Sequence, residues 1–486
     1  MAAVGGSGDD GTIVPVEPPW LKTHVEHNFR VLRIDTAGNA KPANITDDVA
    51  KRVLAARGAW GLPKLGGVVR YPVMRPDGSV LSTPGFDQQT GLLYLGNAND
   101  DADATSRTRA LGDDELRQTL ERAWQPFSLF PFDSPLSRGV FLSALLTTVC
   151  RAALPTAPAF SVTAPAAGTG KGFLGDCLMQ LVDARRSALP LPADDGNETE
   201  KRVFAKLLNG QPGMLLDNLV GVIDNAALCS MLTSAEPEGR PLGKSEIVAV
   251  VNRTLCVLNG NNITMGGDLF RRVLPIRLDA NTERPETREF PFDPRKLIEA
   301  RLHDYRLDLL NVLMTYQAAG APRIGKGGMG SFEEWERLVR QCVCWLIQRG
   351  AVPVAMADPH GALALSRAED PHVAQHAALM DAWHDKYGDD EVQVKVLAAI
   401  ADADSQAGAW CDPYDAALRE VLCEIAAPTG RGGGRFNRRQ FAWWLRAHVG
   451  IIVGGLRIDK CRADAKHGTT WRVTRVPDQA GYALPV

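Results

Sequence analysis

The apolar positions of the chain change their spacing along its length, and this change divides the chain into regions. Between residues 20 and 96 the apolar runs are as short as strands, and Asp77-Gly78 separates two of them as a hairpin turn would. From residue 113 onward apolar residues recur every fourth position, which is the spacing of one helix face. Further helical patterns are predicted at about 295–318, 331–349 and 372–387.

In the middle of the chain, strands are predicted to alternate with helices. The segments 159–163, 213–216 and 250–258 are predicted to be strands, and each is followed by small or polar residues. A helical pattern begins at Phe173, shortly after the first of these strands. Strands that alternate with helices favour a parallel sheet, so we expect an α/β core here.

The loop between the first strand and its helix has the composition of a phosphate-binding loop. In such a loop backbone N–H groups surround phosphates, the helix N-terminus adds positive potential, and a lysine reaches the terminal phosphates. The usual pattern has glycine where Pro165 stands and a hydroxyl residue where Gly172 stands, so a common Mg²⁺ ligand is missing. A loop that only turns the chain is the alternative. The candidate phosphate-binding residues are Ala167, Gly168, Thr169, Gly170, Lys171 and Gly172.

A carboxylate follows the second predicted strand. Asp217 ends the apolar run 213–216, where it could hold Mg²⁺ directly or through water. Asn218 stands beside it, at the place where a group that polarises the attacking water is expected. An apolar run that ends in aspartate is common in proteins. Asp217 therefore supports a nucleotide site only because it follows the candidate phosphate-binding loop in the expected order.

Two further polar segments follow in the order that a nucleotide site requires. Asn261 comes after the third strand and is predicted to contact the γ-phosphate, with Asn262 as the open alternative. Arg271 and Arg272 end a short helix, where one of them could reach the nucleotide of a neighbouring subunit. A solvated surface charge is the alternative for each arginine.

These segments together resemble the AAA+ replicative helicases of prophages and phage satellites, with superfamily 3 character. They also resemble pathogenicity-island initiator helicases and the C-terminal regions of phage primase-helicases. Gly239–Glu246, Gly260–Asn262 and the upstream segments 66–79 and 83–94 share the resemblance, which covers roughly two-thirds of the chain. It implies a P-loop AAA+ ATPase core, ATP and Mg²⁺ as cofactors, and a ring-forming homo-oligomer, with a hexamer expected. The implied activity is that of an ATP-dependent DNA helicase or replication initiator of a mobile element.

The resemblance also implies a nucleic-acid contact between the second and third strands. In related motors a hairpin in this interval points into the central channel and grips the strand backbone. Lys244 is the first candidate for that contact and Arg240 the second, with a surface role as the alternative. A lysine that grips phosphates binds without sequence preference and in a salt-sensitive way, as a translocating motor requires.

The C-terminal part of the chain is strongly basic. Residues 430–475 contain eleven lysines and arginines against Asp459 and Asp464, a net charge of +9, whereas the whole chain has −3. This asymmetry indicates an anionic partner such as single-stranded, forked or origin DNA. A predicted helix at 437–446 and strands at 456–462 and 470–475 suit a winged helix, although such a domain can also serve protein contacts alone. The candidate DNA-binding residues here are Arg435, Arg438, Arg439, Arg446, Arg457, Lys460, Arg462 and Lys466.

Length and composition complete the expected organisation. At 486 residues the chain is long enough for several domains. No apolar run of about 20 residues and no signal sequence is present, which favours a cytoplasmic protein without a membrane partner. His372 and His376 are expected on the surface rather than as metal ligands. The expected regions are a disordered tail at 1–17, a small N-terminal α+β domain at 18–112, the AAA+ domain with leading helices at 113–290, a helical extension at 291–425 and the winged helix at 426–486.

Gly172 and Asn218 leave other functions open. Both depart from an efficient hydrolytic site, so one alternative is a nucleotide-gated DNA-binding regulator with weak or no ATP hydrolysis. A helicase loader, which would bind a partner helicase rather than a free strand, is another. DNA-stimulated ATP turnover distinguishes the motor from the regulator.

Overall fold

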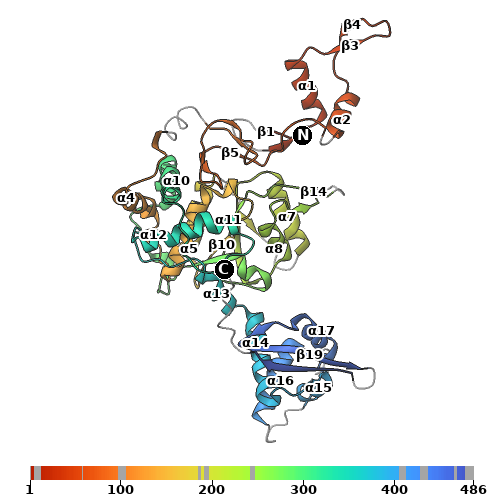
Figure 1. Ribbon diagram of the computed structural model, residues 1–486, viewed down its shortest axis with the longest axis vertical. Helices are drawn as coiled ribbons and strands as arrows, with labels where there is room; N and C mark the ends of the chain where they lie inside the picture. Colours follow the sequence, from red (N-terminus) through yellow and green to blue (C-terminus); the bar gives the residue numbers. More distant parts are fainter. Residues whose placement is uncertain are drawn as a thin grey trace. The chain divides into compact units, whose positions relative to one another are not determined.

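The computed structural model of the chain divides into two compact units (Figure 1), residues 1–366 and 367–486. The expected domain division at 425/426 thus differs from the observed one at 366/367. The helices between these two positions share their core with the C-terminal strands. The structure describes residues 2–4, 13–56, 59–96, 106–183, 188–190, 196–240, 247–403, 412–426, 436–464 and 468–476.

A five-stranded parallel sheet forms the centre of the first unit, as the alternating pattern predicts. Its strand order is β11-β12-β15-β10-β16, and every neighbouring pair is parallel. After β10 the chain crosses to the far edge of the sheet at β11, returns inward through β12 and β15 to lie beside β10, and then adds β16 on the other side of β10. The strands are β10 (Ala159–Ala164), β11 (Ala188–Pro190), β12 (Gly213–Ile223), β15 (Leu255–Met265) and β16 (Val273–Arg277).

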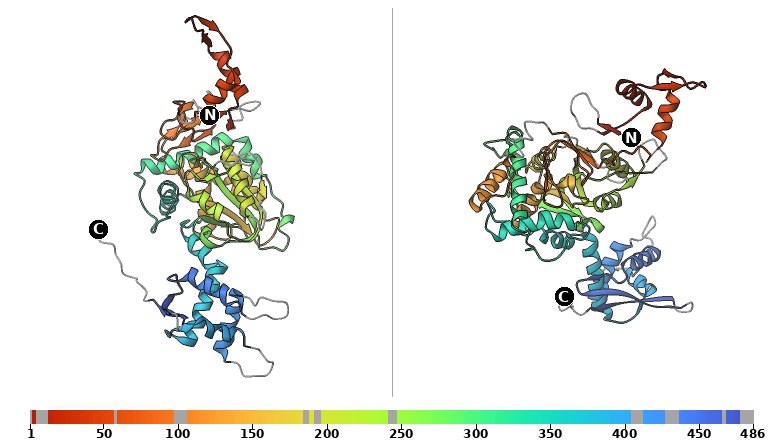
Figure 2. Two further views of the ribbon diagram at one scale, coloured as in Figure 1. Left: turned by 90° about the vertical axis from the view of Figure 1, so that its right-hand side faces the viewer. Right: turned by 45° about the horizontal axis from the view of Figure 1, so that its top comes forward.

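Helices pack on both faces of this sheet (Figure 2). Successive side chains of β12 point to opposite faces of the sheet. Leu215 packs in the apolar core formed with α5 and α6, whereas Met214 and Leu216 pack in the apolar core formed with α7 and α8. Both faces are therefore apolar, as a parallel sheet requires. The helices of this core are α4 (Asp113–Trp124), α5 (Pro135–Thr148), α6 (Lys171–Leu181), α7 (Gly196–Leu208), α8 (Ala226–Thr233), α9 (Pro294–Ala300) and α10 (Leu302–Ala318).

Short elements connect the core. Four of them are 3₁₀ helices, η1 (Gln125–Phe127), η2 (Arg151–Ala153), η3 (Gly267–Arg271) and η4 (Pro285–Thr287). The strands β13 (Glu238–Gly239) and β14 (Val248–Ala249) pair antiparallel and form the base of a hairpin. Of the helices in the described part of the chain, none is both long and apolar enough to cross a membrane.

The N-terminal region contains small helices and strands. The segment 1–17, expected to be a disordered tail, contributes two strands that pair antiparallel, β1 (Ala2–Val4) and β2 (Ile13–Pro15). The predicted hairpin at Asp77-Gly78 is present between β6 (Val73–Met74) and β7 (Val80–Leu81). The other elements are α1 (Pro18–Asn28), β3 (Leu32–Ile34), β4 (Ala40–Pro42), α2 (Asp47–Ala55), β5 (Gly67–Val69), β8 (Gly85–Phe86) and β9 (Leu92–Tyr94).

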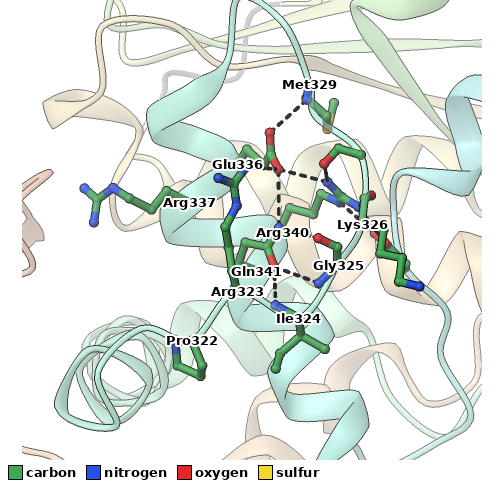
Figure 3. Close-up of polar contacts among 12 residues, drawn as sticks. Pro322, Arg323, Ile324, Gly325, Lys326, Met329, Glu336, Arg337, Arg340 and Gln341 are labelled. Atoms are coloured by element: carbon green, nitrogen blue, oxygen red, sulfur yellow. Dashed lines mark hydrogen bonds and ion pairs between the residues drawn. The ribbon is translucent and has the colours of Figure 1, made fainter. Parts of the chain in front are cut away.

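A buried charge network fixes the segment 322–330 against the last helices of the first unit (Figure 3). These helices are α11 (Glu333–Trp335), the π-helical η5 (Glu336–Arg340) and α12 (Gln341–Gln348). The next helix, α13 (Gly361–Ala368), spans the boundary between the two units. The Arg340 guanidinium is fully buried and lies 3.0 Å from Glu336 Oε1 and 2.8 Å from Asp358 Oδ2. Gln341 Oε1 accepts the N–H groups of Ile324 and Gly325, both at 2.8 Å.

The second unit combines helices with a four-stranded antiparallel sheet of order β17-β20-β19-β18. The predicted helix and its two following strands are confirmed as α17, β19 and β20. Phe441 of α17, Ile458 of β19 and Trp383 of α14 meet in one core. The elements are α14 (Pro371–Tyr387), β17 (Val392–Gln393), α15 (Val394–Ala401), α16 (Pro413–Ile425), α17 (Arg438–His448), β18 (Ile452–Val453), β19 (Leu456–Asp464) and β20 (Gly468–Arg475).

The expectation that His376 lies on the surface is wrong. Its side chain is buried. The centroid of its ring lies 5.2 Å from that of the Trp444 ring and 4.8 Å from that of the His448 ring. Burial, together with the neighbouring His448, lowers the pKa of His376 to about 4. The spacing of residues within α14 does not indicate which other helix covers His376, and in the structure Trp444 and His448 of α17 cover it.

Replacing Arg340 with alanine should destabilise the first unit, because Glu336 would lose a buried ionic partner. We expect the free energy of unfolding to fall by about 3–5 kcal/mol, measured by urea unfolding with tryptophan fluorescence. Arg117→Ala is the control, since its ion pair with Asp114 is exposed and should be worth less than about 1 kcal/mol. Equal losses in the two variants would contradict the structural role of the network.

Candidate functional site

The loop predicted to bind phosphates connects β10 to α6 at the carboxyl edge of the sheet. Gly168 and Gly170 have φ values of +78° and +104°, in the left-handed region that favours glycine, and let the chain turn back into the helix. A Cβ at Gly168 would also lie 2.8 Å from the backbone nitrogen of Glu286 in η4. The helix therefore begins at Lys171 with its N-terminus at this edge, in the orientation that anion binding requires.

Lys171 is buried within this loop. Its Nζ donates to the carbonyl oxygen of Ala166 at 2.8 Å and to Thr169 Oγ1 at 3.3 Å. Burial lowers the pKa of Lys171, and the negative charge of Asp217 partly opposes that shift. The ammonium group is thus held by neutral loop atoms, in a place where an anion would compensate its burial.

Asp217 of β12 and Asn259 of β15 form the second part of the site. Asn259 Nδ2 donates to Asp217 Oδ1 at 2.7 Å, and the backbone N–H of Asn218 donates to the same oxygen at 2.9 Å. The Asn259 side chain is buried, and its Oδ1 has no hydrogen-bond partner among the described residues. The carboxylate is therefore fixed in orientation, with an unsatisfied amide oxygen beside it.

Sequence reasoning singled out Asn261 and missed Asn259. In the parallel register Asn259 lies opposite Val162, whereas Asn261 lies opposite Ala164 at the end of β10 and is exposed. Residues two apart on a strand share a face, so Asn261 lies on the same face, further toward the loop. A signal was available, because Asn259 is a polar residue directly after four apolar strand positions.

Asn218 occupies a bulge within β12, where the regular pairing with β15 is interrupted. Its φ is +58°, a left-handed conformation that asparagine tolerates better than most residues. The register between β12 and β15 shifts between Leu216 and Leu219, and the Asn218 side chain is exposed. The bulge therefore turns the chain at Asp217 and leaves Asn218 facing solvent.

Arg271 and Arg272 both bind Asp268, but their surroundings differ. Arg271 contacts the two Asp268 oxygens at 2.6 and 2.7 Å, and its side chain is 48% exposed. Arg272 lies 2.6 Å from Asp268, donates to the carbonyl oxygen of Cys229 in α8, and is 12% exposed. Arg272 therefore fixes η3 against α8, and Arg271 is the accessible member of the pair.

An apolar cavity adjoins the phosphate-binding loop, and sequence reasoning did not identify it. The cavity is open to solvent, and together with the solvent at its mouth it encloses about 500 Å³. Phe130, Phe173, Phe290 and Phe292 line it together with Gly168–Gly170. Flat apolar walls beside a polar loop suit an aromatic ring. The available signal was the repeated phenylalanine in the segment 290–292.

A second and larger cavity, which encloses about 810 Å³ together with the solvent at its mouth, lies away from these groups. Its lining includes Gly66, Gln211 and Arg253, and the latter two precede the amino ends of β12 and β15. Ligands of open α/β sheets bind at the carboxyl ends of the strands, next to the switch in strand order. We therefore place the candidate site at Lys171, Asp217 and Asn259 in spite of the larger cavity.

The residues present suit a magnesium–nucleotide complex. Among the described residues no group of three or more His, Cys, Asp or Glu side chains could hold a metal ion on its own. Asp217 offers one fixed carboxylate, and the space around Gly172 is open, with nothing within 4 Å of a Cβ built there. One carboxylate, phosphate oxygens and water form a usual ligand set for Mg²⁺.

The predicted nucleic-acid residues fall into four groups. Arg240 is exposed at the base of the β13–β14 hairpin. Arg438 lies 3.8 Å from Asp402, and Arg457 Nη2 donates to Asp459 at 3.1 Å. Lys244, Arg435 and Lys466 lie outside the described residues. The remaining candidates, all exposed on the second unit, are Arg439, Arg446, Lys460 and Arg462.

Comparisons with known proteins give low similarity. No protein-family model and no curated protein matches the sequence at a significant level. The apo A form of the NrS-1 C-terminal region is similar with a TM-score of 0.36 and 12% identity, over 95% of this chain and 100% of that chain. A structure of JCV helicase is similar with a TM-score of 0.22 and 14% identity, over 56% of this chain and 76% of that chain.

Replacing Gly168 with alanine should weaken nucleotide binding at this site. The side chain would require a strained φ of +78° and would collide with the backbone of Glu286. We expect the affinity for a fluorescent ATP analogue to fall by about tenfold or more. Gly172→Ala is the matched control, since its Cβ would meet nothing within 4 Å and binding should change by less than about threefold. Equal affinities of the Gly168 variant and the parent protein would exclude the loop as the binding site.

Proposed function

We propose that this chain is an ATP-dependent DNA motor of the AAA+ class, acting as a helicase or replication initiator of a mobile element. The proposal is carried by one observation, the convergence of Lys171, Asp217 and Asn259 at the carboxyl edge of the parallel sheet. A lysine, a fixed carboxylate and an amide are the groups that bind, neutralise and position a triphosphate.

Each group has a distinct role in this proposal. Lys171 exchanges its hydrogen bond to the Ala166 carbonyl for the β- and γ-phosphates, which compensate its buried charge. Asp217 holds Mg²⁺, directly or through water, and the ion neutralises charge on the phosphates. Asn259 is fixed to Asp217 and has a free amide oxygen, so it can orient the attacking water, with Asn261 nearer to the γ-phosphate.

The apolar cavity takes the base in the same proposal. Phe130 precedes the strands of the sheet in the sequence and Phe290 follows them, and both line the cavity next to the loop. A planar base buries apolar area against such rings while its phosphates extend toward Lys171. The apolar side chains that line the cavity offer no hydrogen bonds to distinguish adenine from guanine. We therefore expect ATP to bind and GTP to be accepted as well.

The proposal includes assembly into a ring, and the accessible arginine supports it. Arg271 is half exposed, and the ion pair that it makes is with Asp268 of its own short helix. Such a group can be released to reach a nucleotide bound by a neighbouring subunit. We therefore assign the trans-acting role to Arg271 rather than Arg272, with a hexamer as the expected ring.

Two parts of the chain would hold DNA. The β13–β14 hairpin, with Arg240 at its base, would grip the backbone of a strand without sequence preference, and Lys244, which follows Arg240 in the sequence, is the other candidate for this contact. The second unit would act as a winged helix, with α17 and the β19–β20 strands presenting basic residues to DNA. DNA contact by both parts suits a motor that is recruited to DNA and then moves along it.

A nucleotide-gated DNA-binding regulator is the second candidate. Gly172 supplies no hydroxyl to Mg²⁺, and Asn218, which faces solvent, cannot act as a carboxylate base. Both observations favour slow hydrolysis after normal binding. A helicase loader shares these features and would differ in binding a partner helicase.

ATP turnover with and without single-stranded DNA tests the proposal. We expect DNA to stimulate ATP turnover by the parent protein. Lys171→Ala should reduce the stimulated rate by about tenfold or more, because the phosphates lose their cationic partner. Lys51→Ala, on the exposed face of α2, is the control and should leave the rate unchanged.

The other outcomes separate the candidates. Binding of ATP through Lys171 without DNA-stimulated turnover would favour the regulator and would contradict the motor. Failure of the parent protein to bind ATP at all would contradict both.

A further inference from the structure

The second unit exposes an aromatic ring that its core does not require. The Trp443 side chain is 66% exposed, the highest value among the tryptophans that the structure describes. On the opposite side of α17, Phe441 and Leu445 are fully buried. The neighbouring Trp444 stacks on His448 with ring centroids 3.9 Å apart and packs against the core of the unit. The packing of α17 therefore does not depend on the Trp443 ring.

Two arginines flank Trp443 on the same helix face. Arg439 precedes it by four positions and Arg446 follows it by three, which are the spacings of neighbouring side chains on a helix surface. Both arginines are exposed, and neither forms an ion pair within the described part of the chain. By contrast, Arg438 on the adjoining face pairs with Asp402.

We propose that Arg439, Trp443 and Arg446 form a binding site for single-stranded nucleic acid, in which an unpaired base stacks on the indole. The inference rests on the proposed function, which assigns DNA binding to this unit. Every base has a π-face that an exposed tryptophan can cover, and the guanidinium groups on either side can contact the phosphates of the same strand. In a duplex the base faces are already stacked, so the site selects unpaired segments.

The charge of the surroundings decides between nucleic acid and a protein partner. Val449, Ile451 and Ile452 are also exposed beyond the end of α17, and an apolar protein surface could cover them. However, the stretch 430–475 has a net charge of +9 and places free arginines on both sides of the ring. An apolar partner would have to cover these cations without compensation, whereas a nucleic-acid strand compensates them.

The test measures binding of the full-length protein to a labelled single strand and to a blunt duplex by fluorescence anisotropy. Trp443→Ala should weaken single-strand binding about tenfold, while duplex binding changes less than about twofold. Trp443→Phe should recover most of the single-strand affinity, because phenylalanine retains a stacking face. Trp20→Ala, which removes the exposed tryptophan of α1, is the control and should change neither affinity.

Tryptophan fluorescence supplies a readout specific to stacking. Adding the single strand should quench the fluorescence of the parent protein, and Trp443→Phe should remove most of that quenching. Equal losses of single-strand and duplex affinity in Trp443→Ala, no loss at all, or unchanged quenching in Trp443→Phe would each overturn the inference.

The proposed function and this inference can fail separately. ATP turnover without DNA should be the same in Trp443→Ala and the parent protein, so a defect in turnover belongs to the first unit. A parent protein that binds no DNA would overturn both. A parent protein that binds single strands, and binds them equally well after Trp443→Ala, would overturn only the inference.

Discussion

The parallel pairing of β10 with β15 on one side and β16 on the other sets the position of every other group in the candidate site. Because these strands run in the same direction, the loop after β10 and the polar residues of β12 and β15 meet at one edge. The register places Leu216 opposite Leu258, so Asp217 and Asn259 follow at the same level and form their hydrogen bond. A slip of one residue would turn Asn259 to the other face of the sheet.

The polar groups at this edge are those that a purely structural sheet would avoid. Lys171 is buried with only neutral hydrogen-bond partners, and Asn259 keeps an unsatisfied amide oxygen. Such groups cost free energy unless a ligand completes them. Other buried cations of the first unit differ in their surroundings. Glu336 and Asp358 compensate the charge of Arg340, whereas Arg151, among the described residues, is buried against oxygens of Thr254, Leu154 and Asn252 alone. Burial of an unpaired charge alone therefore does not identify the site. Its placement is supported by Lys171, Asp217 and Asn259 lying together at the carboxyl edge of the sheet, since perturbed groups that cluster are associated with function.

Local patterns allowed part of this to be predicted from the sequence. The strand–loop–helix around Lys171, the parallel sheet, the Asp77-Gly78 turn and the helix and strands of the second unit are all encoded by residues close together in the chain. Other features depend on tertiary packing. The cavity brings together Phe130 and Phe290, which are far apart in the sequence, and His376 is buried because residues of α17 pack against it. The boundary at 366 likewise reflects a core shared by α14, α16 and β19, which no linker composition indicates.

Hydrogen–deuterium exchange with and without ATP and Mg²⁺ tests most directly the claim that the nucleotide binds at the carboxyl edge of the sheet. Bound phosphates would engage backbone N–H groups of the loop, so amides between Gly168 and Lys171 should exchange more slowly, together with those around Phe290. The N-terminal helices should be unaffected. Protection that appears instead around Gly66 and Gln211, at the larger cavity, or no protection anywhere, would contradict the account.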